Sequence, residues 1–239
     1  MRFERVAVLS FDCYGTLIDW ERGLLGALAP WRERTRLALD DETLLAAFAE
    51  EESSQQVATP TLRYDRLLAR VLERLGRRFA APPTAAETEA FGASVGDWPP
   101  FPDSAEALAR LARRVPLIVL SNVDEGSIRR SAARLGDPFA AILTAEAIGS
   151  YKPDLRNFAY LLGFLAGRGL PREGLVHVAQ SLFHDHAPAA AMGIPSVWID
   201  RRAGRPGGAT KPPPAGTAPA VRFTSLEAFA DAFERVRSA

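Results

Sequence analysis

Short apolar runs separated by helical patterns constrain the fold of this chain more than any other feature. Four runs cover 6–11, 116–120, 175–179 and 196–199, and a weaker one covers 141–144. Their length and β-forming residues are typical of strands buried on both faces of a parallel sheet. Because helical patterns lie between them, we expect an α/β fold with a doubly wound parallel sheet and right-handed crossovers.

The ends of three helices are marked in the sequence. Asp103 to Glu106 has the shape of a capping box, in which the Asp side chain accepts from first-turn amides and Glu follows three residues later. Further helices are predicted over 126–135 and 154–165, where Gly136 and Gly167 stand as stop signals.

The C-terminal part begins with a stretch rich in proline and glycine. Residues 203–220 have this composition, which predicts a surface loop. A short last strand is expected at 221–223. Thr224 to Glu227 then reads as the cap of a closing helix.

The stretch 19–96 differs from the rest because it contains no convincing strand. It holds amphipathic segments such as 64–75, and it follows the first strand directly, so we expect a helical insertion. Consecutive prolines within 98–102 exclude helix and mark the return to the core. The expected division is an α/β core over 1–18 and 97–239, with a helical domain over 19–96.

Composition narrows the class of partner. The 29 basic residues balance 29 acidic ones, whereas nucleic-acid and polybasic membrane binders need a large positive field. No run of about 18 apolar residues exists, so no membrane contact is expected. The lone Cys13 cannot form an internal disulfide, and the N-terminus lacks a signal-peptide layout. These features predict a cytoplasmic protein whose ligand is a small molecule.

Polar residues follow the predicted strands, where ligands bind in an open parallel sheet. In chain order they are Asp12 to Thr16, Ser121-Asn122, Lys152-Pro153, and Gln180-Ser181 with His184-Asp185 just beyond. Only two of the 29 basic residues are lysines, so Lys152 stands out among them. A carboxylate, a hydroxyl–amide pair, a lysine and a second carboxylate are expected to converge on one crevice.

In type and order this set resembles the haloacid dehalogenase (HAD) superfamily. That family places a nucleophilic Asp after its first strand, Ser or Thr after its second, Lys-Pro near its third and acidic residues after its fourth. Asp12, Ser121, Lys152 and Asp185 match, and the resemblance covers nearly the whole chain. It implies a Rossmann-like core, with the helical insertion as the family's cap domain.

The resemblance also implies roles for these residues. Asp12 would attack the substrate and form an ester that water then cleaves, which divides one hard step into two easier ones. Lys152 would lower the pKa of Asp12 and orient it. Asn122 and Ser121 would bind the substrate carboxylate or steady the intermediate. Asp185 would support the hydrolytic step.

The residue two positions after Asp12 indicates the subclass. Phosphatases of the superfamily carry Asp there to protonate a leaving alcohol, whereas 2-haloacid dehalogenases carry Tyr, as here at Tyr14. Gln180 stands where phosphatases have an Asp that binds Mg²⁺, and an amide weakens such a site. No cofactor is therefore expected, although Asp12 and Asp185 would hold Mg²⁺ if it were bound.

These changes favour a 2-haloacid dehalogenase-like hydrolase that displaces a group at the carbon next to the carboxylate of a small 2-substituted acid. A Mg²⁺-dependent phosphatase is an alternative. Three features depart from the dehalogenase pattern. Gln180-Ser181-Leu182 stand in place of the Ser-Ser-Asn cluster that follows the fourth strand. The early cap arginine that clamps the substrate carboxylate has three candidates, Arg32, Arg34 and Arg36. The Tyr expected six residues after Lys152 is replaced by Phe158.

A ring-opening L-azetidine-2-carboxylate hydrolase is a further alternative in the same branch. The resembling stretches are FDCYGTLIDWE (11–21), ESSQQ (52–56), SYKP (150–153) and SLFHDHAPA (181–189). A ring amine leaves well only when protonated, and Tyr14, His184 or the substrate ammonium could meet that need. One glutamate of Glu50–Glu52 facing the crevice would suit an ammonium substrate, although such a run is usually a solvated helix end.

Two further expectations concern the surroundings of the site. Trp20, at the start of the insertion, packs or forms a wall of the substrate pocket, as Trp98 does at its end. His184 lies near the substrate as a proton donor or base. The protein is expected to be a monomer or a homodimer.

Overall fold

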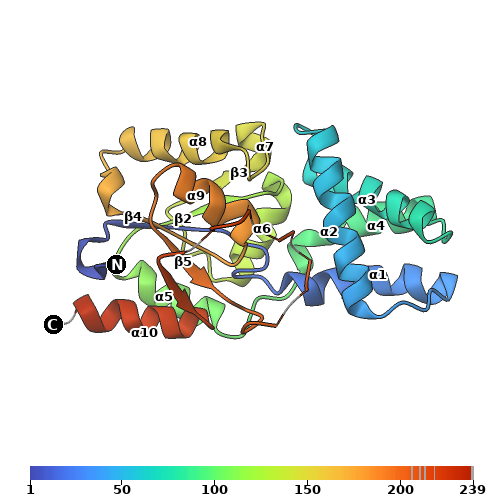
Figure 1. Cartoon of the computed structure of the whole chain (residues 1–239), viewed down its shortest axis with the longest axis horizontal. Coiled ribbons are helices and arrows are strands. Elements are labelled where there is room, and N and C mark those ends of the chain that lie inside the picture. The colour runs from blue at the N-terminus through green and yellow to red at the C-terminus, as the bar shows by residue number, and fades with distance from the viewer. Residues whose placement is uncertain (206, 210, 213, 218, 238–239) are drawn as a thin grey trace.

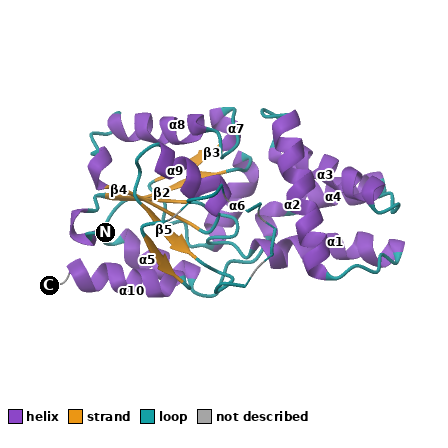
Figure 2. Cartoon of the chain, viewed as in Figure 1, coloured by secondary structure: helices purple, strands orange, loops and turns teal. Residues whose placement is uncertain are grey.

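The computed structural model describes residues 1–237 except 206, 210, 213 and 218. In this part of the chain, six strands form one sheet in the order β3-β2-β1-β4-β5-β6, and every neighbouring pair is parallel (Figures 1 and 2). The strands are β1 (Val8–Phe11), β2 (Leu117–Ser121), β3 (Ala141–Thr144), β4 (Leu175–Ala179), β5 (Ser196–Ile199) and β6 (Val221–Phe223). The predicted α/β fold with a doubly wound sheet is confirmed.

Four strands have the predicted bounds, and the first two differ by one or two residues. β1 begins at Val8 rather than Val6, because Phe3–Arg5 forms a 3₁₀ turn that the Val6 N–H closes on Phe3. β2 extends to Ser121, which pairs with Thr144 of β3. The strand therefore carries Ser121 to the carboxyl edge of the sheet.

The side chains of the strands alternate between two faces of the sheet. Leu9 belongs to a large apolar cluster that includes α5 (Ser104–Ala112) and α10 (Leu226–Arg237). Val8 belongs to a second cluster, built with α8 (Leu155–Ala166). Figure 1 shows α8 and α10 on opposite sides of the sheet, so both faces are covered. This explains why the strands read as apolar runs without alternation.

The remaining helices of the core lie in the connections between the strands. They are α6 (Glu125–Arg134), α7 (Ala145–Ile148), α9 (Ala187–Ala191) and the π-helical turn η4 (Leu182–His186). α6 and α8 lie within one residue of their predicted bounds, and Gly136 after α6 has the positive φ of +81° typical of a stop. The described residues of 203–220 contain no helix or strand, as predicted for a loop; 206, 210, 213 and 218 lie outside the described residues.

Asp103 does not play the predicted role. It precedes α5, yet its side chain accepts no hydrogen bond from that helix. Its carboxylate instead binds Arg201 at 2.8 Å and accepts from the backbone N–H groups of Leu226 and Glu227. Asp103 therefore caps α10, which begins more than a hundred residues later in the chain. Arg201 holds the Asp103 carboxylate in this position.

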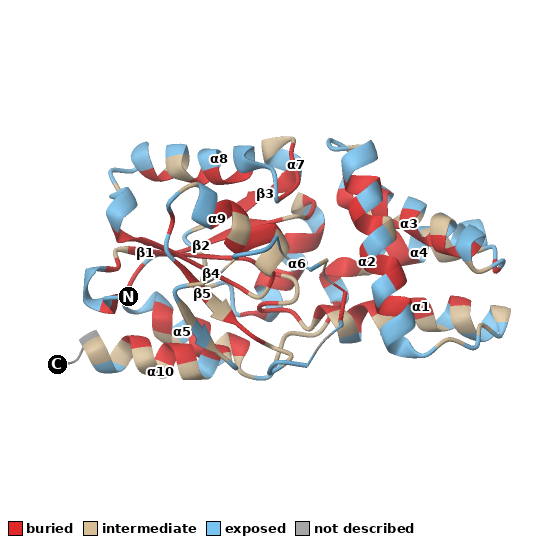
Figure 3. Cartoon of the chain, in the orientation of Figure 1, coloured by how far each residue is buried: buried red, intermediate tan, exposed pale blue. Residues whose placement is uncertain are grey.

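The residues between β1 and α5 form four α-helices at one end of the molecule, right in Figure 1. We call α1 (Trp20–Thr35), α2 (Asp41–Ala58), α3 (Tyr64–Arg78) and α4 (Ala85–Ala93) the cap helices. Figure 3 shows that their buried faces turn toward one another and toward the core. This agrees with the helical insertion expected from the sequence, and we retain its borders at 18/19 and 96/97 as a proposal.

Trp98 packs where the chain returns from the cap helices to the core. It is buried, and a Cβ added at Gly23 of α1 would lie 2.3 Å from its ring, so only glycine allows this approach. The Trp98 ring also meets Tyr14 edge-on at 5.9 Å. Across the described residues, no helix combines the length and apolar character needed to cross a membrane.

Candidate active site

The carboxyl ends of the strands line one cleft that faces the cap helices. The cleft is narrow, with a cavity volume of about 40 Å³. Its walls are Asp12, Tyr14, Trp20, Glu52, Gln56, Tyr64, Ser121, Asn122, Lys152, Gln180, Ser181, His184 and Asp185. The eight residues predicted for catalysis or substrate contact all line it, whereas the candidate arginines for the substrate carboxylate do not: the eight are Asp12, Tyr14, Trp20, Ser121, Asn122, Lys152, His184 and Asp185.

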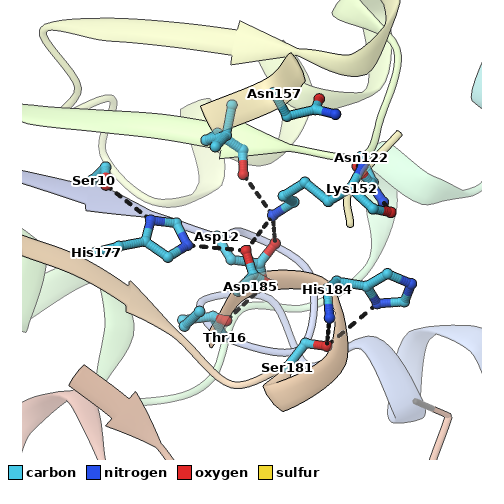
Figure 4. Close-up of polar contacts among 12 residues, drawn as sticks. Ser10, Asp12, Thr16, Asn122, Lys152, Asn157, His177, Ser181, His184 and Asp185 are labelled. Carbon is cyan, nitrogen blue, oxygen red and sulfur yellow. Dashed lines mark hydrogen bonds and ion pairs between the residues drawn. The ribbon is translucent and has the colours of Figure 1, made fainter. Parts of the chain in front are cut away.

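Lys152 lies at the centre of the site (Figure 4). Its Nζ donates to Asp12 Oδ1 at 3.0 Å, to Asp185 Oδ1 at 2.6 Å and to the backbone O of Leu120 at 2.8 Å. The ammonium is 1% exposed, so all three of its protons are used inside the protein. The two carboxylates are thus held by one buried cation.

The charges of these groups depend on one another. Burial raises the pKa of Asp12, and Asp185 adds to the rise, although Lys152 and Thr16 act against it. Burial also raises the pKa of Asp185, but Lys152 and His177 more than offset it and hold that pKa below its usual range. The predicted lowering of the Asp12 pKa by Lys152 is therefore present but outweighed. A carboxylate of higher pKa is the stronger nucleophile once ionised.

Thr16 fixes the other oxygen of Asp12. Its hydroxyl donates to Asp12 Oδ2 at 2.6 Å and accepts from the backbone N–H of Gln180 at 2.9 Å. The loop can turn back this sharply because Gly15 has a φ of +88°. Both oxygens of Asp12 therefore have donors, and its carboxylate is held in one orientation.

Asp185 belongs to η4. The pattern of polar residues after the strands did not predict this π-helical turn. Asp185 Oδ1 accepts from Lys152 and from Nε2 of His177 at 2.9 Å, while Nδ1 of that histidine contacts Ser10 Oγ at 2.8 Å (Figure 4). Asp185 Oδ2 has no hydrogen-bond partner among the described residues. A buried, ionised oxygen without a donor costs free energy, and Asp185 lines the cleft.

Asn122 binds the backbone rather than open space. Its Oδ1 accepts from the Lys152 N–H at 2.7 Å, and its Nδ2 donates to the Lys152 carbonyl at 2.9 Å. The side chain lines the cleft, but two of its hydrogen bonds already fix the loop that carries Lys152. Contact with substrate through its remaining N–H stays a prediction.

Ser121 and Trp20 each offer a donor to the cleft. Both side chains are buried, and neither Ser121 Oγ nor Trp20 Nε1 has a partner within the described part of the chain. Tyr14 differs, because its hydroxyl bonds to Ser131 Oγ at 2.8 Å. Burial raises the pKa of Tyr14 well above its usual value, so its phenol stays neutral.

His184 is a buried member of the cleft wall. Its Nδ1 lies 3.3 Å from Ser181 Oγ, whereas its Nε2 finds no partner in the described residues. Burial lowers its pKa to about 4, so the ring is neutral near pH 7. It therefore offers one uncharged ring nitrogen to a ligand.

The cap side of the cleft contains a carboxylate whose orientation the sequence left open. Glu52 of α2 is 3% exposed and accepts from the Tyr64 hydroxyl at 2.6 Å. Burial raises its pKa to about 7, and it forms no ion pair with a described basic residue. Of the three consecutive glutamates, Glu50 and Glu51 bind arginines on α3, and only Glu52 faces the cleft. Gln56 follows one helical turn later.

The candidate arginines for a substrate carboxylate lie elsewhere. Arg32 binds Asp41 at 2.7 Å and Arg34 binds Glu87 at 2.6 Å, while Arg36 ends α1 in a left-handed conformation. None of them lines the cleft. The helix that carries them points these side chains outward, so the expected clamp is not formed by these residues.

The residues present do not fit a Mg²⁺ site well. Among the described residues, no group of three or more His, Cys, Asp and Glu side chains is arranged to hold a metal ion. The space between Asp12 and Asp185 is bridged by the Lys152 ammonium. We therefore derive no step through a metal, and the expected independence of cofactors stays a prediction.

Comparisons with known proteins show the family of the chain. The haloacid dehalogenase-like hydrolase family matches residues 6–177. An (S)-2-haloacid dehalogenase from Pseudomonas sp. (strain YL) is 35% identical over 105 residues, which are 43% of this chain and 44% of that enzyme. The chain thus matches less than half of the length of this curated relative.

Solved structures show the same fold. An L-2-haloacid dehalogenase from Xanthobacter autotrophicus with chloropropionic acid covalently bound has a TM-score of 0.77 at 15% identity, covering 96% of this chain and 98% of that one. A Bacillus subtilis HAD-hydrolase bound to magnesium has a TM-score of 0.76 at 16% identity, covering 96% and 99%. Similarity this distant shows the fold alone. Together with the family match, it establishes that the chain belongs to the haloacid dehalogenase-like hydrolases.

Proposed function

We propose that the protein hydrolyses a small 2-substituted carboxylic acid, as a 2-haloacid dehalogenase does, through an ester on Asp12. The observation that carries this proposal is the buried Lys152 that bridges Asp12 and Asp185. One carboxylate is held as a nucleophile, and a second lies beside it with a free oxygen. The (S)-2-haloacid dehalogenase relative supports the substrate class.

In the first step, Asp12 attacks carbon 2 of the substrate. A bond forms between a carboxylate oxygen and that carbon, the carbon–halogen bond breaks, and the electron pair leaves with the halide. No proton is needed because halide is a stable anion. The neutral phenol of Tyr14, already bound to Ser131, agrees with a step that lacks a general acid.

In the second step, water adds to the carbonyl carbon of the Asp12 ester. Asp185 accepts the proton of that water through Oδ2, and the ester bond to the substrate oxygen breaks. The alkoxide takes up the proton from Asp185 and leaves as a 2-hydroxy acid, and Asp12 releases the remaining proton of the water to solvent as it returns to a carboxylate. Lys152 stabilises the negative charge that develops on the ester oxygen.

Neutral donors would bind the substrate carboxylate. Ser121 Oγ, Trp20 Nε1 and His184 Nε2 line the cleft, and each lacks a partner among the described residues. Among the described residues, no arginine lines the cleft. We propose that these three groups replace the arginine clamp expected from the dehalogenase pattern.

Single turnover in H₂¹⁸O tests the ester. With enzyme in excess over 2-chloropropionate, the label should enter Asp12 and not the 2-hydroxy acid, because water attacks the carbonyl carbon of the side chain. Mass spectrometry of the peptide that contains Asp12 measures it. Label found only in the product would contradict the proposal.

Two controls accompany that measurement. Asp12→Asn should lower turnover by at least about 10³-fold, because the nucleophile is lost while the shape is kept. Dialysis against a chelator should leave halide release unchanged. Phosphate release from a phosphomonoester that vanishes with the chelator would instead indicate the Mg²⁺-dependent phosphatase.

Glu52 favours a second candidate, the ring-opening of L-azetidine-2-carboxylate. With Lys152 paired to two carboxylates, an ionised Glu52 gives the cleft an excess of negative charge, which suits a substrate carrying an ammonium. Attack of Asp12 on carbon 2 would break its bond to the ring nitrogen. The electron pair would go to nitrogen, which already carries its protons as an ammonium and so leaves as a neutral amine.

Glu52→Gln discriminates the two substrates, since glutamine still accepts from Tyr64 but carries no charge. For an azetidine substrate, kcat/KM should fall by about tenfold or more, in line with the loss of a buried charge pair. For 2-chloropropionate it should be unchanged or rise. An equal effect on both substrates would remove the support that Glu52 gives to the ring-opening reaction.

A further inference from the structure

His177 is a buried, polar side chain in the middle of the sheet that the proposed reaction does not use. It lies on β4 and is 0% exposed. Its ring packs edge-on against Phe158 of α8, with ring centres 5.2 Å apart. An imidazole on this apolar face costs free energy unless both ring nitrogens have partners, and here both do.

The direction of these hydrogen bonds follows from the chemistry of the groups. Asp185 is held ionised by Lys152, and a carboxylate only accepts, so His177 donates from Nε2. A neutral ring that donates from Nε2 accepts at Nδ1, where the Ser10 hydroxyl lies at 2.8 Å. The chain of contacts thus runs from Ser10 through the imidazole to the second carboxylate of the cleft (Figure 4).

Both donors to Asp185 reach the same oxygen. Lys152 Nζ and His177 Nε2 lie 2.6 Å and 2.9 Å from Oδ1, whereas Oδ2 has no partner among the described residues. Two donors that approach one oxygen from different elements prevent the carboxylate from rotating. The other oxygen is then left to the cleft.

We propose, building on the ester mechanism, that His177 is a positioning residue that holds Asp185 so that Oδ2 receives the hydrolytic water. The need is greatest after the first step. Esterified Asp12 is no longer charged, so Asp185 is the one carboxylate left to Lys152 in the described site. Without His177, Asp185 would turn both oxygens toward that ammonium and withdraw the acceptor from the water.

The test compares His177→Phe with His177→Gln. Phenylalanine fills the ring volume without a donor, whereas the side-chain amide of glutamine places an N–H near the position of Nε2. In His177→Phe, ester formation should proceed at the parent rate while ester hydrolysis slows by about tenfold, as expected when a hydrogen bond to a charged group is lost. Intact-protein mass spectrometry after rapid quenching should show the ester accumulating. His177→Gln should restore most of the hydrolysis rate.

The pH profile of ester hydrolysis provides a second readout. Loss of the donor raises the pKa of Asp185, so activity in His177→Phe should begin to fall at a higher pH than in the parent. The titratable groups around Asp185 are Asp12, Lys152, His177, and the imidazoles of His184 and His186 on its own turn. The same direction with a smaller shift is expected for Ser10→Ala, which also serves if His177→Phe does not fold.

Phe158→Leu is the matched control because it loosens the packing of the His177 ring without touching its hydrogen bonds. It should lower the Tm and leave the pH profile unchanged. If His177→Phe behaves like this control, or if glutamine restores nothing, His177 is structural and the proposal is wrong. A parent enzyme that never forms the ester would refute the proposed function instead. In that case, a ¹³C NMR titration of the Asp185 carboxyl group still tests the positioning role. An unchanged pKa of Asp185 in His177→Phe would overturn that role.

Discussion

The two ends of the cleft hold their buried carboxylates with different partners. On the core side, Asp12 and Asp185 share one ammonium at 3.0 and 2.6 Å. On the cap side, the described residues offer Glu52 one donor, the neutral Tyr64 hydroxyl. Burial is nearly the same at both ends, at 7%, 1% and 3% exposure, so the difference lies in the partners.

This contrast separates fixed charge from adjustable charge. The core carboxylates keep a set position because the cation and several donors fix them, which suits groups that react. Glu52, whose pKa burial raises to about 7, changes charge near neutral pH. We infer that the core end determines the chemistry and that the cap end adjusts which substrate charge is accepted.

Removal of the shared cation should destabilise the core end of the cleft and cause the largest loss in the free energy of unfolding. Lys152→Met leaves two buried carboxylates facing each other without a counter-ion, and breaking a buried ion pair costs about 3–5 kcal/mol. Urea unfolding at pH 7 should show this loss, and turnover should be undetectable. The loss should shrink at low pH, where the carboxylates protonate.

The other lysine supplies the control for that prediction. Lys211 is partly exposed and contacts neither Asp12 nor Asp185. Lys211→Met should leave the free energy of unfolding within about 0.5 kcal/mol of the parent, as is usual for surface positions. A Lys152→Met variant no less stable than Lys211→Met would mean that the core carboxylates are not held ionised by this pair.

The core end could be predicted from the sequence because a parallel sheet aligns the ends of its strands. Once Asp12, Ser121 and Lys152 were placed after buried runs, their convergence followed from topology. Side-chain directions did not follow. Asn122 forms two hydrogen bonds with the Lys152 backbone, a contact set by the path of the loop, and its predicted contact with substrate stays a prediction.

The cap end could not be predicted because helix rotation decides it. Each residue of a helix turns by about 100°, so three consecutive glutamates face three directions. Only the packing of α2 against α3 selects Glu52, while Glu50 and Glu51 meet Arg78 and Arg74. The same reason explains why Arg32 and Arg34 of α1 were plausible clamps in the sequence and form surface ion pairs in the structure.

Neutralising the cap carboxylate should change stability with pH. The pKa of Glu52 rises from 4.5 to about 7 on folding, so the folded protein holds a proton that the unfolded chain releases between these values. Stability therefore falls as pH rises through that window. Glu52→Gln should be more stable than the parent by about 3 kcal/mol at pH 8 and nearly equal to it at pH 4.5.

Glu50→Gln is the control for that comparison, since Glu50 lies on the same helix in an exposed pair with Arg78. Thermal unfolding across pH 4.5–8 should show little change for it. If Glu52→Gln is destabilised at pH 8, then the carboxylate has a cationic partner in solution and the contrast between the two ends is wrong.

The Tyr64 hydroxyl should have a smaller, coupled effect. Tyr64→Phe removes the one donor to Glu52, which raises the pKa of that carboxyl further and costs about 1–2 kcal/mol where Glu52 is ionised. The loss should be larger at pH 8 than at pH 5. A double-mutant cycle with Glu52→Gln measures the part of the coupling that depends on charge, and additive free energies would show that the charge of Glu52 adds nothing to the 2.6 Å contact.

The smallest loss of stability is expected at the ion pairs between the core and the cap helices. Arg202, in the loop after β5, binds Glu21 of α1 at 2.6 Å and Glu42 of α2 at 2.7 Å. Surface ion pairs contribute about 0–1 kcal/mol each, so Arg202→Gln should lower stability by about 1 kcal/mol, and less in high salt. Hydrogen exchange should then speed up in α1 and α2 but not in α5. Arg110→Gln, whose ion pairs with Asp231 and Glu234 stay within the core, should show the reverse. If both variants loosen the same helices, then the cap and core open as one unit, and the adjustable end of the cleft is as rigid as the reacting end.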